Sequence, residues 1–345
     1  MKKSLIQTIL TKIMDKKVTI YDVAREANVS LATVSRVING SSVVKQATKA
    51  RVLEVIERLD FKPNEIARGL AKSKTTTIAV VFPQSLFAHV KDMIGGIGDT
   101  SRTLKYTVTF HTTDDIGEDN MVNELVEKLV KSRADGVILF NNEFLEEEIS
   151  QISKYKIPIV VVGDYMAGDN LGSIHTNVKQ AIYDITCDRL EKGIDDILFV
   201  TTHQNLLSDE EMVSGIKEAY AKYNKTFDQI LESSSEYEES YKQFQEYFKT
   251  HKHQLVIATN DKEGVAVING ATDNQISIPD EMEVIGMFNT TYALMSKPTL
   301  TSINIPIYNM GALAVRLLTK MLNNEEIESN DVEVKYILIQ RQSTK

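Results

Sequence analysis

Apolar residues follow two different patterns along this chain, one before residue 62 and the other after residue 76. In the first part they recur every three or four positions, which is the spacing of amphipathic helices. In the second part, short continuous runs rich in valine and isoleucine alternate with segments of helical spacing. Continuous apolar runs of this length are typical of strands buried on both faces, and such strands form parallel sheets. The sequence therefore predicts a small all-α region followed by a large α/β region.

Three short helices are predicted in the first part, over residues 20–27, 31–39 and 46–59. Thr19 precedes the first helix and Ser30 precedes the second. Both are residue types whose side-chain oxygen accepts a hydrogen bond from a free N–H group at a helix start. The apolar stripes of the three helices are long enough to close a small shared core.

The first two helices are predicted to meet at a tight turn, because Asn28 suits the left-handed conformation and Gly40 suits a helix end. The outward face of the second helix carries small and hydroxyl side chains and one arginine, which can approach and bond base edges in the major groove. These features are typical of a helix-turn-helix, whereas an ordinary helical hairpin would leave this polar face unexplained. The outward residues are Leu31, Ala32, Thr33, Ser35, Arg36 and Asn39.

Charge is distributed unevenly between the two parts. The whole chain has a net charge of −9, but residues 1–74 carry 15 lysines and arginines against 7 aspartates and glutamates. The remaining residues carry 24 basic against 41 acidic side chains. A basic head on an acidic body indicates that only the head contacts a polyanion such as double-stranded DNA.

A short connecting helix is predicted after the head. Pro63 ends the preceding element, and Asn64 can cap a helix over residues 65–72. A helix of about two turns is marginal by itself and can fold upon binding. Leu70 lies between two basic residues, an arrangement that suits a wedge driven into a minor-groove base step. Leu70 could equally be a buried residue of a small core, and the sequence pattern favours neither the wedge nor the core residue.

The chain resembles the LacI/GalR family of repressors in three stretches, VTIYDVAREANVSLATVSRVING (18–40), RVLEVIERLDFKPNEIARGLAKSKTTTIAVV (51–81) and the terminal RQSTK. The resemblance implies that major-groove bases are read by Leu31, Ala32, Thr33 and Arg36. It places near the phosphates Thr19, Tyr21 and Ser30. It gives the role of the family's minor-groove intercalating pair to Leu70 and Ala71.

The body is expected to form two similar α/β lobes, with ligands lodged at the carboxyl ends of the strands. The resemblance implies a periplasmic-binding-protein-like arrangement of these lobes. The expected domains are an N-terminal extension (1–17), a helix-turn-helix domain (18–62), a hinge helix and linker (63–75) and the two-lobed domain (76–345). We expect the first lobe at 76–165 with 304–323, and the second at 166–303 with 324–345.

The sequence offers no assembled catalytic, metal or cofactor site. The run GGIG at 95–98 lacks the spacing and the following Lys-Ser/Thr of a phosphate loop. Cys187, the only cysteine, lies within a helical pattern and fits a reducing compartment. No apolar run approaches the roughly 20 residues that span a bilayer. We therefore expect a cytoplasmic regulator and no enzyme.

Sugar-binding members of the family usually carry charged side chains that bond sugar hydroxyls in the cleft. Here Met212 and Phe288 stand at two of those positions, and only Asp261 remains. These apolar residues make sugar binding less favourable. A regulator that answers to a sugar or sugar phosphate is therefore the alternative hypothesis.

The catabolite control branch of the family answers to serine-phosphorylated HPr, a protein corepressor. Tyr308 and Arg316 match two of its corepressor contacts, and an arginine fork fits a phosphoserine. The chain differs from the catabolite control branch at three positions in the corepressor-binding regions, Gly95, Asn309 and Ile337. The favoured hypothesis is a homodimeric regulator of carbon catabolite control, mainly a repressor, on a palindromic operator.

Overall fold

The computed structural model describes residues 18–38, 40–62, 75–82, 91–112, 121–140, 149, 154–163, 165–166, 168–202 and 207–345. The chain divides into two compact units, Met1–Thr75 and Thr76–Lys345. Across the described segments, no helix has both the length and the apolar character to cross a membrane.

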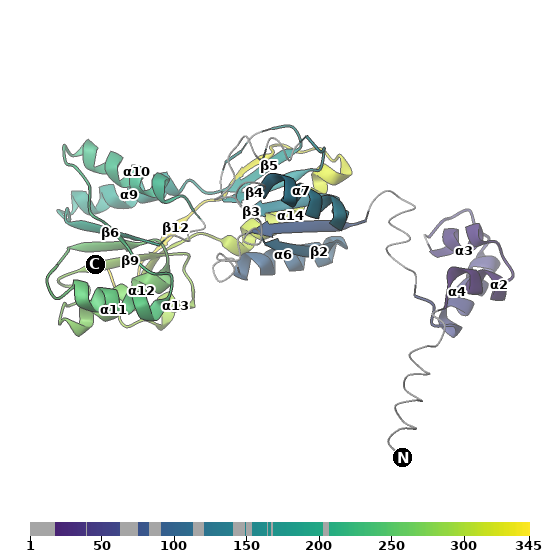
Figure 1. Ribbon diagram of the computed structural model, residues 1–345, viewed down its shortest axis with the longest axis horizontal. Coiled ribbons are helices and arrows are strands. Elements are labelled where there is room, and N and C mark those ends of the chain that lie inside the picture. Colours follow the sequence, from purple (N-terminus) through teal and green to yellow (C-terminus); the bar gives the residue numbers. More distant parts are fainter. Residues whose placement is uncertain are drawn as a thin grey trace, which may run out of the picture. The chain divides into compact units, whose positions relative to one another are not determined.

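The described part of the N-terminal unit is a three-helix cluster (Figure 1). It consists of α2 (Ile20–Glu26), α3 (Leu31–Ile38) and α4 (Gln46–Arg58), within two residues of the predicted bounds. Each helix contributes one apolar stripe to a shared core. The fully or almost fully buried members of that core are Val23, Ala24, Ala27, Val34, Val37, Val52 and Val55.

The second unit contains two sheets of six strands each. The first sheet has the order β11 (Asp331–Glu333), β5 (Leu171–His175), β4 (Ile159–Gly163), β3 (Gly136–Phe140), β1 (Thr77–Phe82) and β2 (Thr107–Thr112). The second has the order β12 (Ile337–Ile339), β10 (Thr301–Asn304), β9 (Glu283–Met287), β8 (Leu255–Ala258), β6 (Ile197–Thr201) and β7 (Ile230–Glu232). All strand pairs are parallel except β10 with β12. The predicted fold class is thus confirmed.

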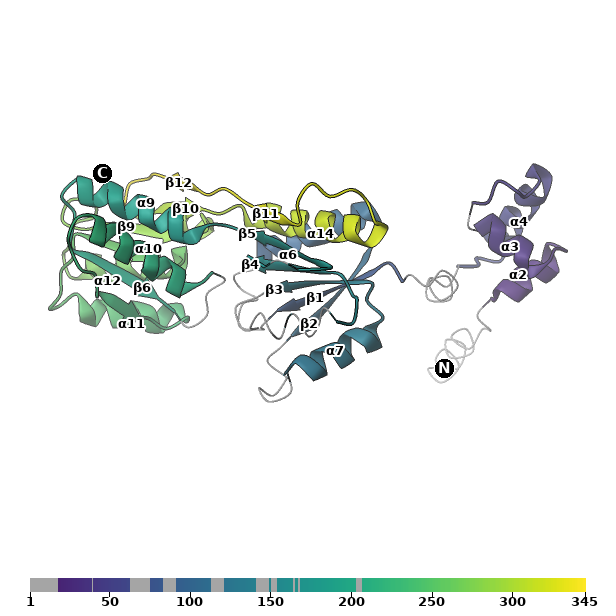
Figure 2. The same ribbon diagram turned by 90° about the horizontal axis from the view of Figure 1, so that it is seen from above.

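Helices cover both faces of each sheet, which explains the continuous apolar strands. In β1, Ile78 and Val80 face α6 (Lys91–Leu104) and α14 (Ile307–Asn323), while the alternate residues face α7 (Met121–Ser132) (Figure 2). The second sheet lies between two further helix layers (Figure 1). These are α9 (Val178–Glu191) with α10 (Asp209–Lys222) on one face, and α11 (Tyr237–Tyr247), α12 (Asp261–Asp273) and the short α13 (Thr291–Met295) on the other.

The α6 and α14 helices approach each other unusually closely. A Cβ atom on Gly96 would overlap the carbonyl oxygen of Tyr308, and one on Gly311 would overlap the carbonyl oxygen of Met93. Glycine is therefore required at both positions for the two backbones to touch. This contact fixes the surface on which Tyr308 is presented.

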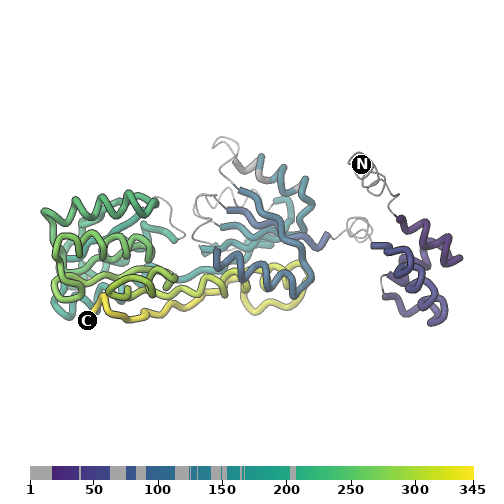
Figure 3. Tube along the Cα trace, turned by 90° about the horizontal axis from the view of Figure 1, so that it is seen from below, coloured from purple at the N-terminus to yellow at the C-terminus, as the bar shows by residue number. Residues whose placement is uncertain are grey.

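Two strands belong to a different lobe from the one that the sequence pattern predicts. β5 and β11 both belong to the first sheet, although we expected residues 166–175 and 331–333 in the second lobe. The reason is that β5 includes a serine and a histidine, and β11 has only three residues, of which two are exposed carboxylates, so neither forms an apolar run. The chain consequently passes between the two sheets at 176–177, 305–306 and 334–336; the last two segments lie in the yellow-green to yellow part of the tube in Figure 3.

Candidate functional site

The start of α2 is locked by a reciprocal cap between Thr19 and Asp22. The Thr19 hydroxyl and backbone N–H donate to the Asp22 carboxylate at 2.7 and 3.0 Å, and the Asp22 N–H donates back to the Thr19 hydroxyl. The pKa of Asp22 is lowered, first by the Thr19 hydroxyl bond and then by the backbone bond. Tyr21 follows the cap and is 67% exposed, so its phenol is free to meet a partner.

The turn and the start of α3 have the predicted geometry. Asn28 adopts a left-handed conformation with φ of 50°, and the Val29 N–H donates to the Ala24 carbonyl. The Ser30 hydroxyl accepts from the Thr33 N–H at 3.2 Å and lies 2.9 Å from the Thr33 hydroxyl. These contacts fix the first turn of the helix that carries the outward face.

The outward face of α3 agrees largely with the sequence prediction. Leu31, Ala32, Ser35 and Arg36 are exposed, whereas Thr33 is half-buried because its hydroxyl engages Ser30. The opposite face buries the α3 valines in the core. Asn39, Leu70 and Ala71 lie outside the described residues.

Positive charge near this face is only partly neutralised. Arg25 pairs with Asp22 at 2.6 Å, and Arg58 pairs with Glu26 at 2.9 Å. No ion pair with any described residue is formed by Arg36, Lys45, Lys49 or Arg51. The described part of the head thus carries four cations without an ion-pair partner in that part, as well as the outward face of α3, and a phosphate-backbone partner requires such charges.

The comparisons with known proteins fit this geometry. The family model described as bacterial regulatory proteins, lacI family, matches residues 19–64. Catabolite control protein A of Priestia megaterium is 33% identical over 332 residues, which cover 95% of this chain and 99% of that protein. The chain belongs to the LacI family of bacterial regulatory proteins. It is a DNA-binding transcriptional regulator of that family.

Other relatives support the LacI-family assignment over both units. Catabolite control protein A of Staphylococcus aureus strain Mu50 is 34% identical over 331 residues, covering 95% of this chain and 99% of that protein. A periplasmic binding protein-like domain model matches residues 189–344. The lac repressor dimer bound to operator and the anti-inducer ONPF has the same fold, with a TM-score of 0.83 at 19% identity over 95% of this chain and 99% of that one. The members of this family are regulators of transcription and not enzymes.

Asp261, which we expected in a ligand cleft, is fully buried and internally bonded. Its carboxylate accepts from the Ser302 hydroxyl at 2.6 Å and from the hydroxyl and N–H of Thr290. Burial raises the pKa of Asp261 to about 6, against the lowering effect of these bonds. The side chain therefore joins α12 to β10 and to the residue before α13.

Met212 and Phe288, the two apolar residues at the family's sugar-binding positions, differ in their surroundings. Met212 is fully buried within α10 and belongs to the core. Phe288 follows β9 with φ of 83°, a backbone conformation that costs a non-glycine residue roughly 1–3 kcal/mol. Neither side chain can offer a hydrogen bond to a sugar hydroxyl.

Sequence reasoning missed a group of buried polar side chains beside Asp261. The Thr259 hydroxyl, the Asn260 amide nitrogen and both Glu263 carboxylate oxygens are buried without a hydrogen-bond partner among the described residues, although the Lys262 ammonium lies 3.8 Å from one Glu263 oxygen. Burial raises the pKa of Glu263 to about 7. A signal existed, because Glu263 stands three and four residues before the buried Ala266 and Val267 on one helical stripe.

Tyr308 and Arg316 lie on the same side of α14 and line one groove against α6. The Tyr308 hydroxyl donates to Asp99 at 2.9 Å, and this bond raises the pKa of the phenol. Gly95 lies under the Tyr308 ring, because a Cβ atom there would be 3.6 Å from the ring. The groove has a volume of about 260 Å³ and is lined by Asp99, Thr100, Thr103, Leu104, Tyr308 and Arg316.

The other residues that the sequence singled out lie apart from this groove or beneath the surface. Asn309 is exposed on α14, and Ile337 lies on β12 of the second sheet with 60% of its surface exposed. Cys187 is buried in α9, with the Lys222 ammonium 3.9 Å from its sulfur. In the described part of the chain, no group of three His, Cys, Asp or Glu residues is placed to hold a metal ion.

Proposed function

We propose that this LacI-family regulator acts in carbon catabolite control, mainly as a repressor, with serine-phosphorylated HPr as its corepressor. The observation that carries the proposal is the pairing of two surfaces in one chain. One is the outward face of α3 with the exposed Arg36, and the other is the α6–α14 groove with Tyr308 and Arg316. The curated relatives named catabolite control protein A support the same assignment.

On the DNA side, base edges are read from the first turns of α3. Leu31 and Ala32 provide small apolar contacts for thymine methyl groups, and Arg36 provides two parallel donors for guanine. The other base contacts are Thr33 and Ser35 of α3 and, beyond the described end of that helix, Asn39. Phosphate contacts come from Thr19, Tyr21 and Ser30, which lie at two capped helix starts whose free N–H groups favour anions. Leu70 and Ala71 enter the minor groove at the centre of the operator.

The regulator acts as a homodimer on a palindrome. One head spans a single half-site, so a two-fold pair doubles the contacts and fixes the spacing of half-sites. The α13 surface supports self-association, because it exposes Tyr292, Leu294 and Met295 by 49%, 60% and 79%. A cluster of exposed apolar side chains on a short helix is typical of a surface that another protein covers.

On the corepressor side, Arg316 supplies the guanidinium that receives the phosphoserine, and Tyr308 packs against the partner beside it. Arg316 is exposed and forms no ion pair with the described residues, so its charge is available. A charge-assisted, bidentate arginine–phosphate contact is among the strongest polar contacts that a surface can offer.

The second candidate is a regulator that answers to a small sugar or sugar phosphate. The buried polar atoms of Thr259, Asn260 and Glu263 that lack hydrogen-bond partners among the described residues favour a small polar effector, because they lie at the carboxyl end of β8 and the start of α12. Met212 and Phe288 count against it, since neither can bond a hydroxyl.

The deciding experiment selects bound duplexes from a random DNA pool, with the full-length protein alone and with serine-phosphorylated HPr. A palindrome enriched more strongly with the phosphorylated partner than with unphosphorylated HPr supports the proposal. Enrichment that is unchanged by HPr and increased by a sugar or sugar phosphate supports the second candidate.

A further inference from the structure

The connection between the two lobes is organised around the segment 331–339. Its first part, β11, pairs in parallel with β5 of the first sheet, and its last part, β12, pairs antiparallel with β10 of the second sheet. Both neighbours themselves lead into a passage between the lobes, at 176–177 and 305–306. The segment 334–336 is therefore flanked by two strands that pair with the strands leading into the other two connections.

The pairing with β5 extends into the passage itself. The Val334 N–H donates to the His175 carbonyl at 2.7 Å, and the Thr176 hydroxyl donates to the Val334 carbonyl at 2.8 Å. Further on, the Tyr336 hydroxyl donates to Asp184 of α9 at 2.8 Å. Opening of β11 from β5 would release the two Val334 bonds and lengthen the free connection between the lobes, whereas the Tyr336 bond would stay within the second lobe.

One side-chain cluster holds the beginning of β11 in place. The Asp331 carboxylate lies 2.8 Å from the His175 ring nitrogen Nε2 and accepts from the Ser173 hydroxyl at 2.8 Å. The His175 side chain is 13% exposed, and that of Asp331 is 42% exposed. Since β11 contributes only three residues to the sheet, this cluster is a large share of what binds it there.

We propose that His175 and Asp331 form a protonation-dependent clasp on the connection between the lobes, which tightens when the imidazole is charged. Histidine is the side chain whose charge ordinarily changes between pH 5 and 8. A hydrogen bond between two charged groups is roughly twice as strong as one with a neutral donor. The freedom of the connection thus depends on whether the imidazole carries a second proton, whichever effector or corepressor the regulator binds.

The charges around the clasp are consistent with this role. Among the described residues, those that face His175 are Asp331 and Glu333 of β11, and the register places Glu333 directly opposite it. The Tyr165 ring meets the imidazole edge-on at 5.7 Å. On the β4 side the paired residue is Gly163, which has no side chain. The surroundings described are therefore acidic or neutral.

The chain contains a matched control for this pair. His253 lies 2.9 Å from Asp196 and is 9% exposed, so it is a second partly buried histidine–aspartate pair. It also bonds the Tyr247 hydroxyl of α11 at 2.8 Å, entirely within the second lobe. A change at His253 alters a similar contact and leaves the connection untouched.

The test is amide hydrogen exchange of the full-length protein, followed by mass spectrometry at about pH 6 and about pH 8. The readout is the protection of the peptide that contains Val334, divided by that of a peptide containing Val284, whose N–H is bonded within the second lobe at 2.9 Å. This ratio removes intrinsic exchange rates and changes in overall stability. We expect it to be about fivefold higher at pH 6 in the unmodified protein.

The variants give each result a definite meaning. His175→Gln and Asp331→Asn should make the ratio independent of pH, while His253→Gln should leave it as in the unmodified protein. Asp331→Asn alters a half-exposed residue and serves if His175→Gln does not fold. The proposal is overturned if the unmodified protein shows equal ratios at both pH values, if Asp331→Asn retains the difference, or if His253→Gln removes it.

Discussion

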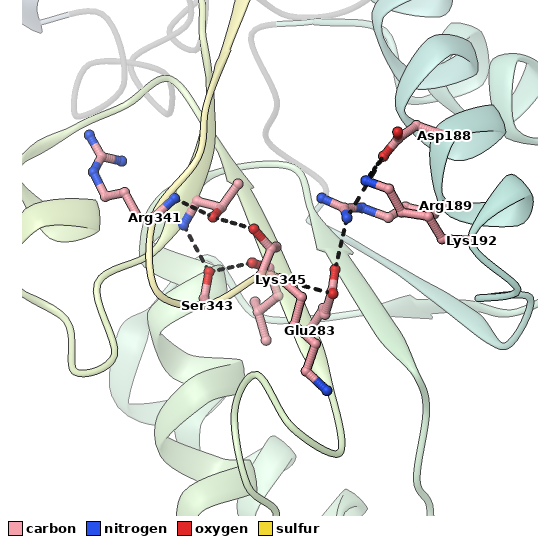
Figure 4. Close-up of polar contacts among 10 residues, drawn as sticks. Asp188, Arg189, Lys192, Glu283, Arg341, Ser343 and Lys345 are labelled. Carbon is pink, nitrogen blue, oxygen red and sulfur yellow. Dashed lines mark hydrogen bonds and ion pairs between the residues drawn. The ribbon is translucent and has the colours of Figure 1, made fainter.

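The guanidinium of Arg189 lies 3.3 Å from the carboxylate of Glu283, and both side chains are almost fully buried. Arg189 belongs to the last turns of α9, and Glu283 begins β9, so the pair joins a helix to the sheet that it covers. The other oxygen of Glu283 accepts from the Lys345 N–H at 3.1 Å, which ties the terminal RQSTK to the same point (Figure 4).

Removing one partner of the Arg189–Glu283 pair should lower the stability strongly, and replacing both partners with apolar residues should restore most of it. Removing one partner of a buried ion pair costs about 3–5 kcal/mol, because the other charge is left without compensation. We expect Glu283→Ala to lower the free energy of unfolding in urea by about that amount. The double variant Arg189→Met with Glu283→Leu should recover most of the loss, since apolar replacement of both partners is often neutral. A double variant no more stable than Glu283→Ala would show that the contact is not the cause.

The close approach of α6 and α14 predicts opposite effects of one substitution at two nearby glycines. Gly96→Ala should destabilise the protein by about 1–3 kcal/mol, because the new methyl group overlaps the Tyr308 backbone. Gly98 has open space, so Gly98→Ala should stabilise α6 by up to about 1 kcal/mol. Urea midpoints of both variants provide the measurement. Equal shifts of the same sign would mean that the helices are not in close contact.

Glu263 predicts that the protein is more stable in mild acid than at alkaline pH. Its folded-state pKa of about 7 lies above the ordinary value of 4.5, so the folded protein binds more protons than the unfolded chain between these values. The contribution therefore favours folding below pH 4.5 and is lost as the pH rises through 7. We expect a difference on the order of 2 kcal/mol between pH 5 and pH 8 in urea unfolding. Glu263→Gln should reduce this difference, and an unchanged pH profile would contradict the assignment.

Replacement of Arg36 should weaken specific DNA binding while the head remains folded. Arg36→Ala should weaken binding to the selected operator by about 1–3 kcal/mol, or roughly 5- to 150-fold, and should relax the preference at the guanine that it contacts. Fluorescence anisotropy at fixed salt measures both effects. Arg58→Ala is the control, because that arginine is already paired with Glu26. Similar losses from both variants would indicate general electrostatics instead of base reading.

Replacement of Arg316 should remove the response to the corepressor while DNA binding without the corepressor is unchanged. Arg316→Ala should remove most of the increase in operator affinity produced by serine-phosphorylated HPr, while affinity without the partner stays unchanged. Lys320→Ala changes an exposed cation one turn further along α14 and should retain the response. A full response from Arg316→Ala would move the corepressor site elsewhere.

Local pattern was sufficient for the head and for the class of the body. Capping residues at Thr19 and Ser30, a left-handed turn at Asn28 and the valines of α3 set the three helices, because each signal acts within a few residues. The apolar runs likewise predicted most strands, since a strand buried on both faces cannot carry exposed polar groups. The surface of α3 followed directly from its helical spacing.

Contacts between distant residues decided what remained. β5 joined the first sheet by pairing with β4, and β11 joined it by pairing with β5, where Ser173 bonds Asp331 across 158 positions. Asp261 was a ligand candidate in sequence, and only the fold shows that its carboxylate also cross-links Thr290 and Ser302. No local pattern encodes such pairs, because whether a polar side chain binds a ligand or another part of the chain depends on which segments the fold brings beside it. The sequence alone thus determined the helices, the apolar strands and the outward face of α3, whereas tertiary packing determined the connection between the lobes and which carboxylates are buried.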